Sequence, residues 1–298
     1  MTLLPENSFD KFIGIDWSGA YGKTNKKLKV AICEPGNELP RLIRPEMGKH
    51  WSRSKLVNWL IQEAAQKRIL AGMDFGFAYP YTDNNAYFPG SANSPKTVFD
   101  LWQTLESVCK ESPNFYAGSF YKHHNSSFSA YLCYQTYKGE LFDNNRLRKT
   151  ELASKLLGAR PSCLFKMVGS DQAGSGSASG IRVLHHIASN YSGNFSIWPF
   201  DSVSNAKSVI VEIYPRLFFA IAKQNSHQYT VPGAVNSVLK YYGSKPLTDD
   251  VGNYNEDEID AIISAAALRS IAVDVNMWQP ARMDEQARQF EGWIFGCR

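Results

Sequence analysis

Cysteine is scarce and scattered in this chain. Five cysteines are spread over 298 residues, and no two of them form a Cys-x-x-Cys pair. Their odd number and wide spacing exclude a disulfide framework and a zinc knuckle as the basis of the fold. We therefore expect a reducing environment, and the cytoplasm is the default expectation for localisation.

Long apolar runs are also lacking. No run approaches the ~20 residues that a membrane-spanning helix requires. The first eleven residues carry Glu6 and Asp10 where an export signal has an apolar core. A composition of 44% hydrophobic and 20% charged residues is that of an ordinary globular protein, so disordered and low-complexity classes are excluded. We expect a protein without a membrane partner, and the sequence leaves its oligomeric state open.

The net charge is only +4, but it is distributed unevenly. Residues 121–170 carry eight Lys and Arg against three acids, whereas residues 246–291 carry ten acids against three arginines. This polarity suits an anionic partner at one place and a cation at another, and two solvated surfaces would give the same pattern.

The hydrophobic pattern predicts an α/β fold. Three strands, a helix and a fourth strand are expected at residues 11–18, 26–33, 40–44, 54–68 and 69–75. A strand at 194–200, a strand at 207–213, a helix beginning at Pro215 and a helix at 255–273 follow near the other end of the sequence. We therefore predict one domain over residues 1–298, with a core of about 11–75 and 194–298.

Residues 76–193 differ in kind and are predicted to be a large, mainly helical insertion. Helices are expected at about 94–111, 128–137 and 149–157, the first with Ser94 as N-cap and Pro95 in the first turn. The glycine-rich stretch 171–180 is expected to be a functional loop or the start of a helix.

Acidic residues at the ends of buried strands are the most informative feature. Asp16 ends Phe-Ile-Gly-Ile, and Asp74 ends Leu-Ala-Gly-Met. A single aspartate at such a place commonly caps a turn. Two aspartates that both follow an apolar strand favour a functional site. Glu212 is a third acid and lies among β-branched residues, where an unpaired charge is costly to bury.

The last predicted helix supplies two more acids. Asp257 and Asp260 are three residues apart and so share one helical face. Acids in a first helical turn often only complement the helix dipole, but Asp260 lies deeper. Carboxylates that converge without thiols are ligands for hard cations, so Mg²⁺ or Mn²⁺ is the expected cofactor.

These motifs carry a resemblance. The order βββαβ, strand, helix, with acids on the first strand, the fourth strand and the last helix, is similar to the ribonuclease H-like fold, and Asp257-x-x-Asp260-Ala resembles the corresponding helix of RuvC-type resolvases. Gly14-Ile-Asp16, Met73-Asp74, Val211-Glu-Ile-Tyr-Pro215 and Glu291-Gly-Trp-Ile294 resemble an uncharacterised bacterial family of predicted RNase H-like nucleases, a domain of unknown function.

The resemblance implies a metal-dependent nuclease that hydrolyses DNA or RNA. Asp16, Asp74 and Asp260 would be the metal ligands, with Asp257 and Glu212 as auxiliary catalytic acids. One metal ion would activate a water and a second would stabilise the leaving 3′ oxygen. RuvC-like enzymes tend to have a glutamate where this chain has Asp74, and the shorter side chain would alter the metal spacing.

The insertion is the expected substrate-binding part, with nucleic acid as partner. Eight aromatic residues between 115 and 137 lie beside basic residues and could stack unpaired bases, although packing of the rings against the sheet is the favoured interpretation. The predicted phosphate-binding residues are Lys122, His124, Arg146, Arg148 and Lys149.

Two other functions stay open. An ATP-binding phosphotransferase of the actin and sugar-kinase group shares the RNase H-like core and could use residues 171–180 for phosphates, although the second core of that group is missing. A nucleic-acid-binding module without catalysis would keep the fold, but it would have no reason to keep five acids.

Overall fold

The chain folds around a six-stranded mixed sheet. The computed structural model describes residues 9–122, 127–168, 173–204, 207–228, 231–248 and 251–298. The strands lie in the order β3-β2-β1-β4-β9-β8. Their bounds are Lys11–Asp16 (β1), Lys29–Cys33 (β2), Arg41–Ile43 (β3), Ile69–Met73 (β4), Ser208–Glu212 (β9) and Phe195–Ile197 (β8).

The sheet is antiparallel on one side and parallel on the other. Strands β1, β2 and β3 form an antiparallel meander. Helix α1 (Arg53–Gln66) returns the chain to β4, which pairs parallel to β1 and to β9, and β8 completes the parallel side. The protein is therefore an α/β protein, as the sequence pattern predicts.

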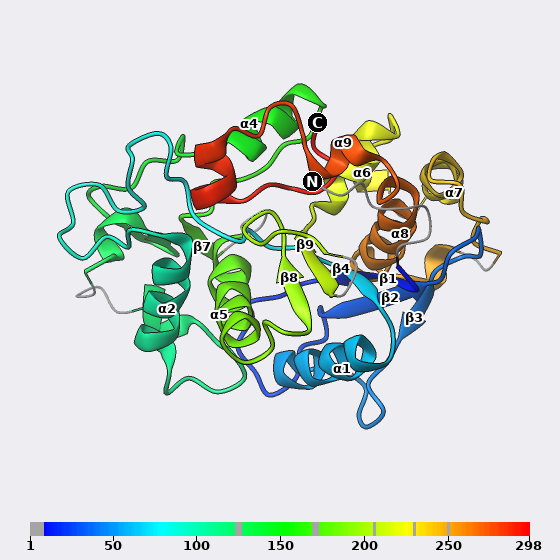
Figure 1. Cartoon of the computed structure of the whole chain (residues 1–298), viewed down its shortest axis with the longest axis horizontal. Helices are drawn as coiled ribbons and strands as arrows, with labels where there is room; N and C mark the ends of the chain where they lie inside the picture. Colours follow the sequence, from blue (N-terminus) through cyan, green and yellow to red (C-terminus); the bar gives the residue numbers. More distant parts are fainter. Residues whose placement is uncertain (1–8, 123–126, 169–172, 205–206, 229–230, 249–250) are drawn as a thin grey trace.

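Helices cover both faces of this sheet (Figure 1). Ile13 and Ile15 of β1 pack with α1 and with α5 (Gly174–Asn190) in one hydrophobic cluster. Phe12, on the opposite face, belongs to a second cluster with α6 (Pro215–Ile221), α7 (Pro232–Tyr241) and α8 (Glu256–Ile271). Because successive strand residues point to opposite faces, β1 contributes to both cores.

The described part of residues 76–193 contributes α5 to one face of the sheet and contains both helices and short strands. The elements before α5 are α2 (Val98–Cys109), α3 (Gly118–Tyr121), η1 (Ser129–Tyr131), β5 (Cys133–Tyr134), β6 (Tyr137–Lys138), α4 (Lys149–Leu156) and β7 (Lys166–Val168). Strands β6, β5 and β7 form a second, three-stranded sheet. The predicted helix 128–137 is wrong, because Gln135 adopts a left-handed φ of 52° in the tight turn that joins β5 to β6.

Helix starts follow local capping chemistry. Helix α2 begins after Thr97, not after Ser94, because the Thr97 hydroxyl accepts from the Asp100 amide and the Asp100 carboxylate accepts from the Thr97 amide. Asn255 and Glu258 form the same reciprocal pair at the start of α8, and Pro215 occupies the first turn of α6 as predicted.

The remaining short elements are η2 (Ser226–Gln228), η3 (Val251–Asn253), α9 (Val275–Trp278) and η4 (Ala287–Glu291). In the part of the chain that the structure describes, no helix has both the length and the apolar character needed to cross a membrane.

Candidate active site

Two aspartates leave neighbouring strands at the same edge of the sheet. Asp16 is the last residue of β1, and Asp74 directly follows β4. Strand pairing places Ile15 opposite Met73, and the Asp74 amide donates to the Ile15 carbonyl at 3.0 Å. Each aspartate lies two residues after a glycine and so faces the same side of the sheet as that glycine.

Helix α8 crosses this face at very short range. A Cβ atom on Gly14 would lie 2.3 Å from the Ala261 carbonyl oxygen and 2.6 Å from the Ala265 amide nitrogen. Only glycine permits this approach, which brings the first turn of α8 beside the strand ends. Asp257 lies in that first turn, and Asp260 begins the next one.

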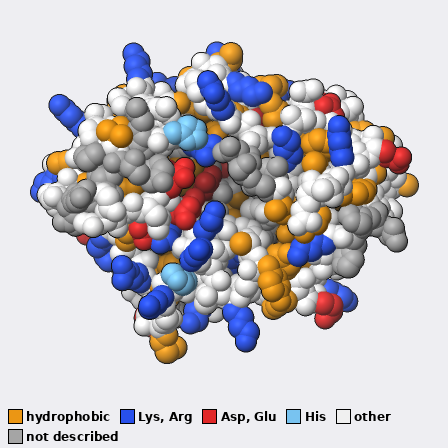
Figure 2. Space-filling model, turned by 180° about the vertical axis from the view of Figure 1, so that it is seen from behind, with side chains coloured by type: hydrophobic (Ala, Val, Ile, Leu, Met, Phe, Trp, Pro, Cys, Tyr) orange, Lys and Arg blue, Asp and Glu red, His pale blue; other side chains and the backbone are white. Residues whose placement is uncertain are grey.

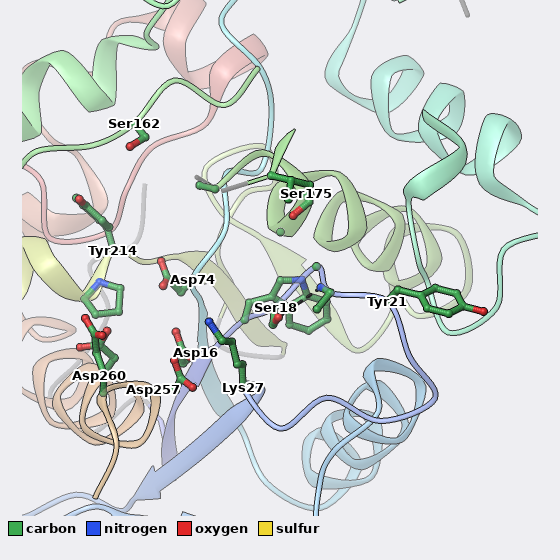
Figure 3. Close-up of a pocket in the computed structure, with 18 of the residues that line it drawn as sticks. Asp16, Ser18, Tyr21, Lys27, Asp74, Ser162, Ser175, Tyr214, Asp257 and Asp260 are labelled. Carbon is green, nitrogen blue, oxygen red and sulfur yellow. Dashed lines mark hydrogen bonds between the residues drawn. The ribbon is translucent and has the colours of Figure 1, made fainter. Parts of the chain in front are cut away.

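The acids line one cavity of about 760 Å³. Figure 2 shows acidic side chains in a hollow near the middle of one face, with Lys and Arg side chains around it. In Figure 3 the carboxylates of Asp16, Asp74, Asp257 and Asp260 surround one space, with Lys27 beside Asp16. The acidic residues of the lining are Asp16, Asp74, Glu256, Asp257 and Asp260.

The carboxylates raise each other's pKa. Burial, followed by the charges of Asp74 and Asp260, raises the pKa of Asp16 well above its ordinary value. Burial and the charge of Glu212 raise the pKa of Asp74 to about 7, against the opposing effects of Arg216 and of a hydrogen bond with Asp16. Burial and Asp74 also raise the pKa of Asp260 well above the ordinary value. Such a cluster favours a bound proton or cation.

The donor set suits a hard cation in its chemistry, because it consists of oxygen ligands without thiols. As the side chains stand, however, no group of three or more Asp, Glu, His or Cys residues within the described ranges is arranged so that it could hold a metal ion. Asp16 and Asp74 are already within hydrogen-bonding reach of each other. Binding of a cation by these two and Asp260 therefore requires their side chains to converge further.

Glu212 lies near the cluster but does not line the cavity. It is 2% exposed and receives two hydrogen bonds from the Arg148 guanidinium, at 2.8 and 2.5 Å, and one from the Phe77 amide at 2.9 Å. Both carboxylate oxygens are therefore occupied by structural partners. The structure brings Glu212 to Asp74 as a buried charge and gives it no access to the cavity.

The predicted phosphate-binding residues are separated in the structure. Arg148 is 1% exposed and is held by Glu151 and Glu212, and Arg146 is 7% exposed and binds Asp83 at 2.6 and 2.9 Å. These guanidinium groups are engaged inside the protein, which does not fit contact with a substrate. The reason is that the sequence shows the positive charges but not their acidic partners, which come from distant segments.

The other members of that set have different positions. Lys149 forms an ion pair with Asp284 on the surface. Among the described members of the predicted set, Lys122 is the one that lines the cavity, on its tyrosine side. His124 lies outside the described residues.

The motif Glu291-Gly-Trp-Ile294 is a structural anchor. The Glu291 carboxylate accepts hydrogen bonds from the backbone amides of Tyr81, Thr82 and Lys149. Ile294 forms a β-bridge with Glu212. This segment therefore ties the insertion to β9.

Two cations at the cavity were missed by the sequence analysis. Arg216 follows Pro215 at the start of α6. Lys27 lies two residues before Lys29, the residue of β2 that is opposite Asp16 in the strand register. Burial raises the pKa of Asp74, Asp260 and Asp257; the charge of Arg216 opposes this rise at Asp74 and Asp260, and the charge of Lys27 opposes it at Asp257. Arg216 lies shortly after the end of β9, and Lys27 lies just before the start of β2. These positions were the features of the sequence that could have identified both residues as part of the site.

The sequence leaves two options for residues 171–180, a functional loop or the start of a helix. Residues Ala173, Ser175 and Gly176 line the cavity opposite the acids, so the glycine-rich stretch is the entry to a helix from Gly174 onward. Gly19, from the β1–β2 connection, packs against it, since a Cβ atom on Gly19 would lie 2.2 Å from the Ser175 carbonyl oxygen; the neighbouring Ser18 also lines the cavity.

Comparison with known proteins adds no relative: no protein-family model, no curated sequence and no solved structure matches this chain.

Proposed function

We propose that this protein is a divalent-metal-dependent nuclease with an RNase H-like core. The observation that carries the proposal is the convergence of Asp16, Asp74 and Asp260, from two neighbouring strands and a crossing helix, on one cavity. The antiparallel meander, the parallel pairing of β1 with β4, and the acid-bearing final long helix support the RNase H-like assignment.

Asp16, Asp74 and Asp260 are the residues that would hold Mg²⁺ or Mn²⁺. When bound, the cation supplies a Lewis acid that lowers the pKa of a water and polarises the phosphate. Mutual repulsion of the buried carboxylates supports this role, since a cation in their midst would relieve it. Asp257 is half-buried in the first turn of α8 and extends the acidic wall.

The cations of the chain complete the site for a phosphodiester. Arg216 and Lys27 line the cavity next to the acids and would hold the non-bridging phosphate oxygens. The first residues of α5 line the same space, so the N-terminus of this helix adds a favourable dipole for an anion. An anionic substrate is thereby attracted to a site whose acids alone would repel it.

A second candidate rests on the contact between Gly19 and Ser175. The β1–β2 connection and the start of α5 meet at the cavity, an arrangement that would also suit the phosphates of a nucleotide. An ATP-dependent phosphotransferase is therefore the alternative to test.

The test is an activity assay with matched variants. The protein is incubated with end-labelled single-stranded, duplex and branched DNA and with RNA, in Mg²⁺, Mn²⁺ or EDTA, and with ATP in parallel. We expect metal-dependent cleavage that D16N and D260N each abolish while remaining folded. E111Q serves as control because Glu111 is 91% exposed.

Two outcomes would reject the nuclease. ATP turnover without cleavage would favour the phosphotransferase, and binding without either reaction would favour a non-catalytic module. Full cleavage by D16N or D260N would reject the assigned acids.

A further inference from the structure

An exposed tyrosine lies in the cavity wall, away from the acidic residues. Tyr21 belongs to the β1–β2 connection, lines the cavity with Asp16 and is 75% exposed. Figure 3 shows its ring extending from this loop, on the side of the cavity away from Asp257 and Asp260. An exposed ring at the edge of a cavity has a free face for contact with a bound molecule.

The backbone on both sides of Tyr21 is anchored. The Arg53 guanidinium donates to the carbonyls of Ser18 at 2.7 Å and Ala20 at 3.1 Å. The Asn114 side-chain amide donates to the Gly22 carbonyl at 3.0 Å. The ring is thus presented from a loop that is fixed immediately before and after it.

The anchor itself is costly to maintain. Arg53 is fully buried, and burial lowers its pKa to about 10. Among the described residues it has no carboxylate partner, and its Nη2 has no hydrogen-bond partner. Asn114, whose carbonyl accepts from Arg53 Nε at 2.7 Å, adopts a left-handed φ of 55°. A buried cation and a residue with a left-handed backbone both hold this surface loop in place. This indicates that a fixed position of the loop is important for the cavity.

The insertion supplies a second tyrosine and a cation beside the first. Tyr116 contacts Tyr21 edge-on, with ring centroids 5.0 Å apart. Lys122 Nζ lies 5.3 Å from the Tyr116 centroid and 6.0 Å from the Tyr21 centroid. Tyr121 and Tyr134, in mutual contact at 5.2 Å, continue this wall.

We propose that Tyr21, supported by Tyr116 and accompanied by Lys122, is a stacking subsite for an unpaired base of the nucleic-acid substrate. This inference rests on the proposed nuclease function and specifies its substrate as single-stranded or flipped-out nucleotides. Each base of a duplex already has its faces covered by its neighbours, whereas an unpaired base has a free face for an aromatic ring. Lys122 would hold a phosphate flanking that base.

Pre-organisation gives the subsite its effect. A loop fixed by Arg53 and Asn114 loses little freedom when a base stacks on Tyr21, so most of the stacking free energy appears as affinity. A single stacked base contributes about 1–3 kcal/mol to single-strand binding, which corresponds to roughly 5- to 150-fold in Kd.

The experiment measures binding separately from cleavage. Fluorescein-labelled oligo(dT), oligo(U) and a duplex of equal length are titrated with the protein in Ca²⁺, and binding is read by anisotropy. We expect single strands to bind more tightly than duplex, Y21A to weaken single-strand binding roughly 5- to 150-fold, and Y21F to remain within about twofold of the original chain. Comparison of oligo(dT) with oligo(U) shows which nucleic acid supplies the base.

Y241A is the matched control, since Tyr241 is a 57% exposed tyrosine on α7 outside the cavity lining. Unchanged binding of single strands by Y21A, equal binding of duplex, or no single-strand binding by the original chain would overturn the subsite. The two proposals fail separately: Tyr21-dependent binding without cleavage rejects only the nuclease, and cleavage with an unchanged KM in Y21A rejects only the subsite.

Discussion

Gly14 of β1 and Gly72 of β4 lie directly opposite each other in the sheet, on the face that α8 covers. A Cβ atom on Gly14 would meet the α8 backbone, and one on Gly72 would meet the Ile213 and Leu268 side chains at 2.6 and 2.8 Å. The absence of two side chains therefore sets the distance between α8 and the two strands. The same absence sets how close Asp260 comes to Asp16 and Asp74.

We predict graded costs for alanine at these glycines. G14A must displace backbone, so we expect it to lower the free energy of unfolding by about 3 kcal/mol. G72A meets side chains and no backbone, but one of the contacts is the Ile213 Cγ2 methyl on a stiff, β-branched side chain, so we expect a smaller cost of about 2 kcal/mol. Urea denaturation measures both, with G193A as control because nothing lies within 4 Å of its added Cβ. A G14A chain as stable as G193A would contradict the close crossing of α8.

The pH dependence of stability follows from Asp74. Its pKa is about 7 in the folded protein, against about 3.9 in the unfolded chain. Between these values the folded state holds a proton that the unfolded state has released, so stability falls as pH rises from about 4 to about 7. In EDTA we expect a decrease of up to about 1.4 kcal/mol per pH unit for each retained proton.

Denaturation at several pH values checks this prediction. D74N should flatten the dependence, and Mg²⁺ should restore stability above pH 7 in the original chain. A stability that rises over this range in EDTA would show that the buried carboxyl is not held protonated.

Neutralising one acid should stabilise the protein while removing its response to metal. In D260N the repulsion between Asp260 and the ionised neighbours is lost, so we expect a gain of about 1 kcal/mol at pH 8 in EDTA. Thermal denaturation with and without Mg²⁺ measures both effects, and E111Q should behave as the original chain in both conditions. An equal Mg²⁺ stabilisation of D260N and the original chain would exclude Asp260 as a ligand.

Arg148 should matter for stability and not for binding. R148A leaves the buried carboxylates of Glu151 and Glu212 without their cation, and we expect a loss of about 3–5 kcal/mol. K155A, a change at an exposed lysine of the same helix, should have little effect. Denaturation gives the stability, and anisotropy at a temperature where R148A is still folded gives the affinity. A normal stability with weakened nucleic-acid binding would return Arg148 to the substrate-binding set.

The core of the fold could be predicted because its signals are local. The strand preceding Asp16 and the helix after Asn255 are specified by apolar periodicity and by a cap within a few residues. The order of these elements then limited the arrangement of the sheet. The β5–β6 hairpin could not be predicted, because a left-handed Gln135 has no signal in its residue type.

The candidate site residues could be predicted only where secondary structure alone sets the position of the side chain. Asp16 and Asp74 follow in-register strands, so their proximity follows from the pairing of β1 with β4. Arg148 and Glu212 are 64 residues apart, and their pairing depends on how the insertion packs against β9. The spacing of residues in the sequence does not reveal long-range ion pairs of this kind. The basic residues were therefore predicted to bind substrate, whereas the structure shows that Arg146 and Arg148 are buried and form ion pairs.

The cavity draws its two walls from different parts of the chain. The acids and Arg216 come from segments around the central sheet, whereas Tyr116, Tyr121, Lys122 and Tyr134 come from residues 76–193. Variation in the second set can therefore proceed without disturbing the first. Under the proposed function, substitutions in this second set would alter the substrate preference while the carboxylates stay in place.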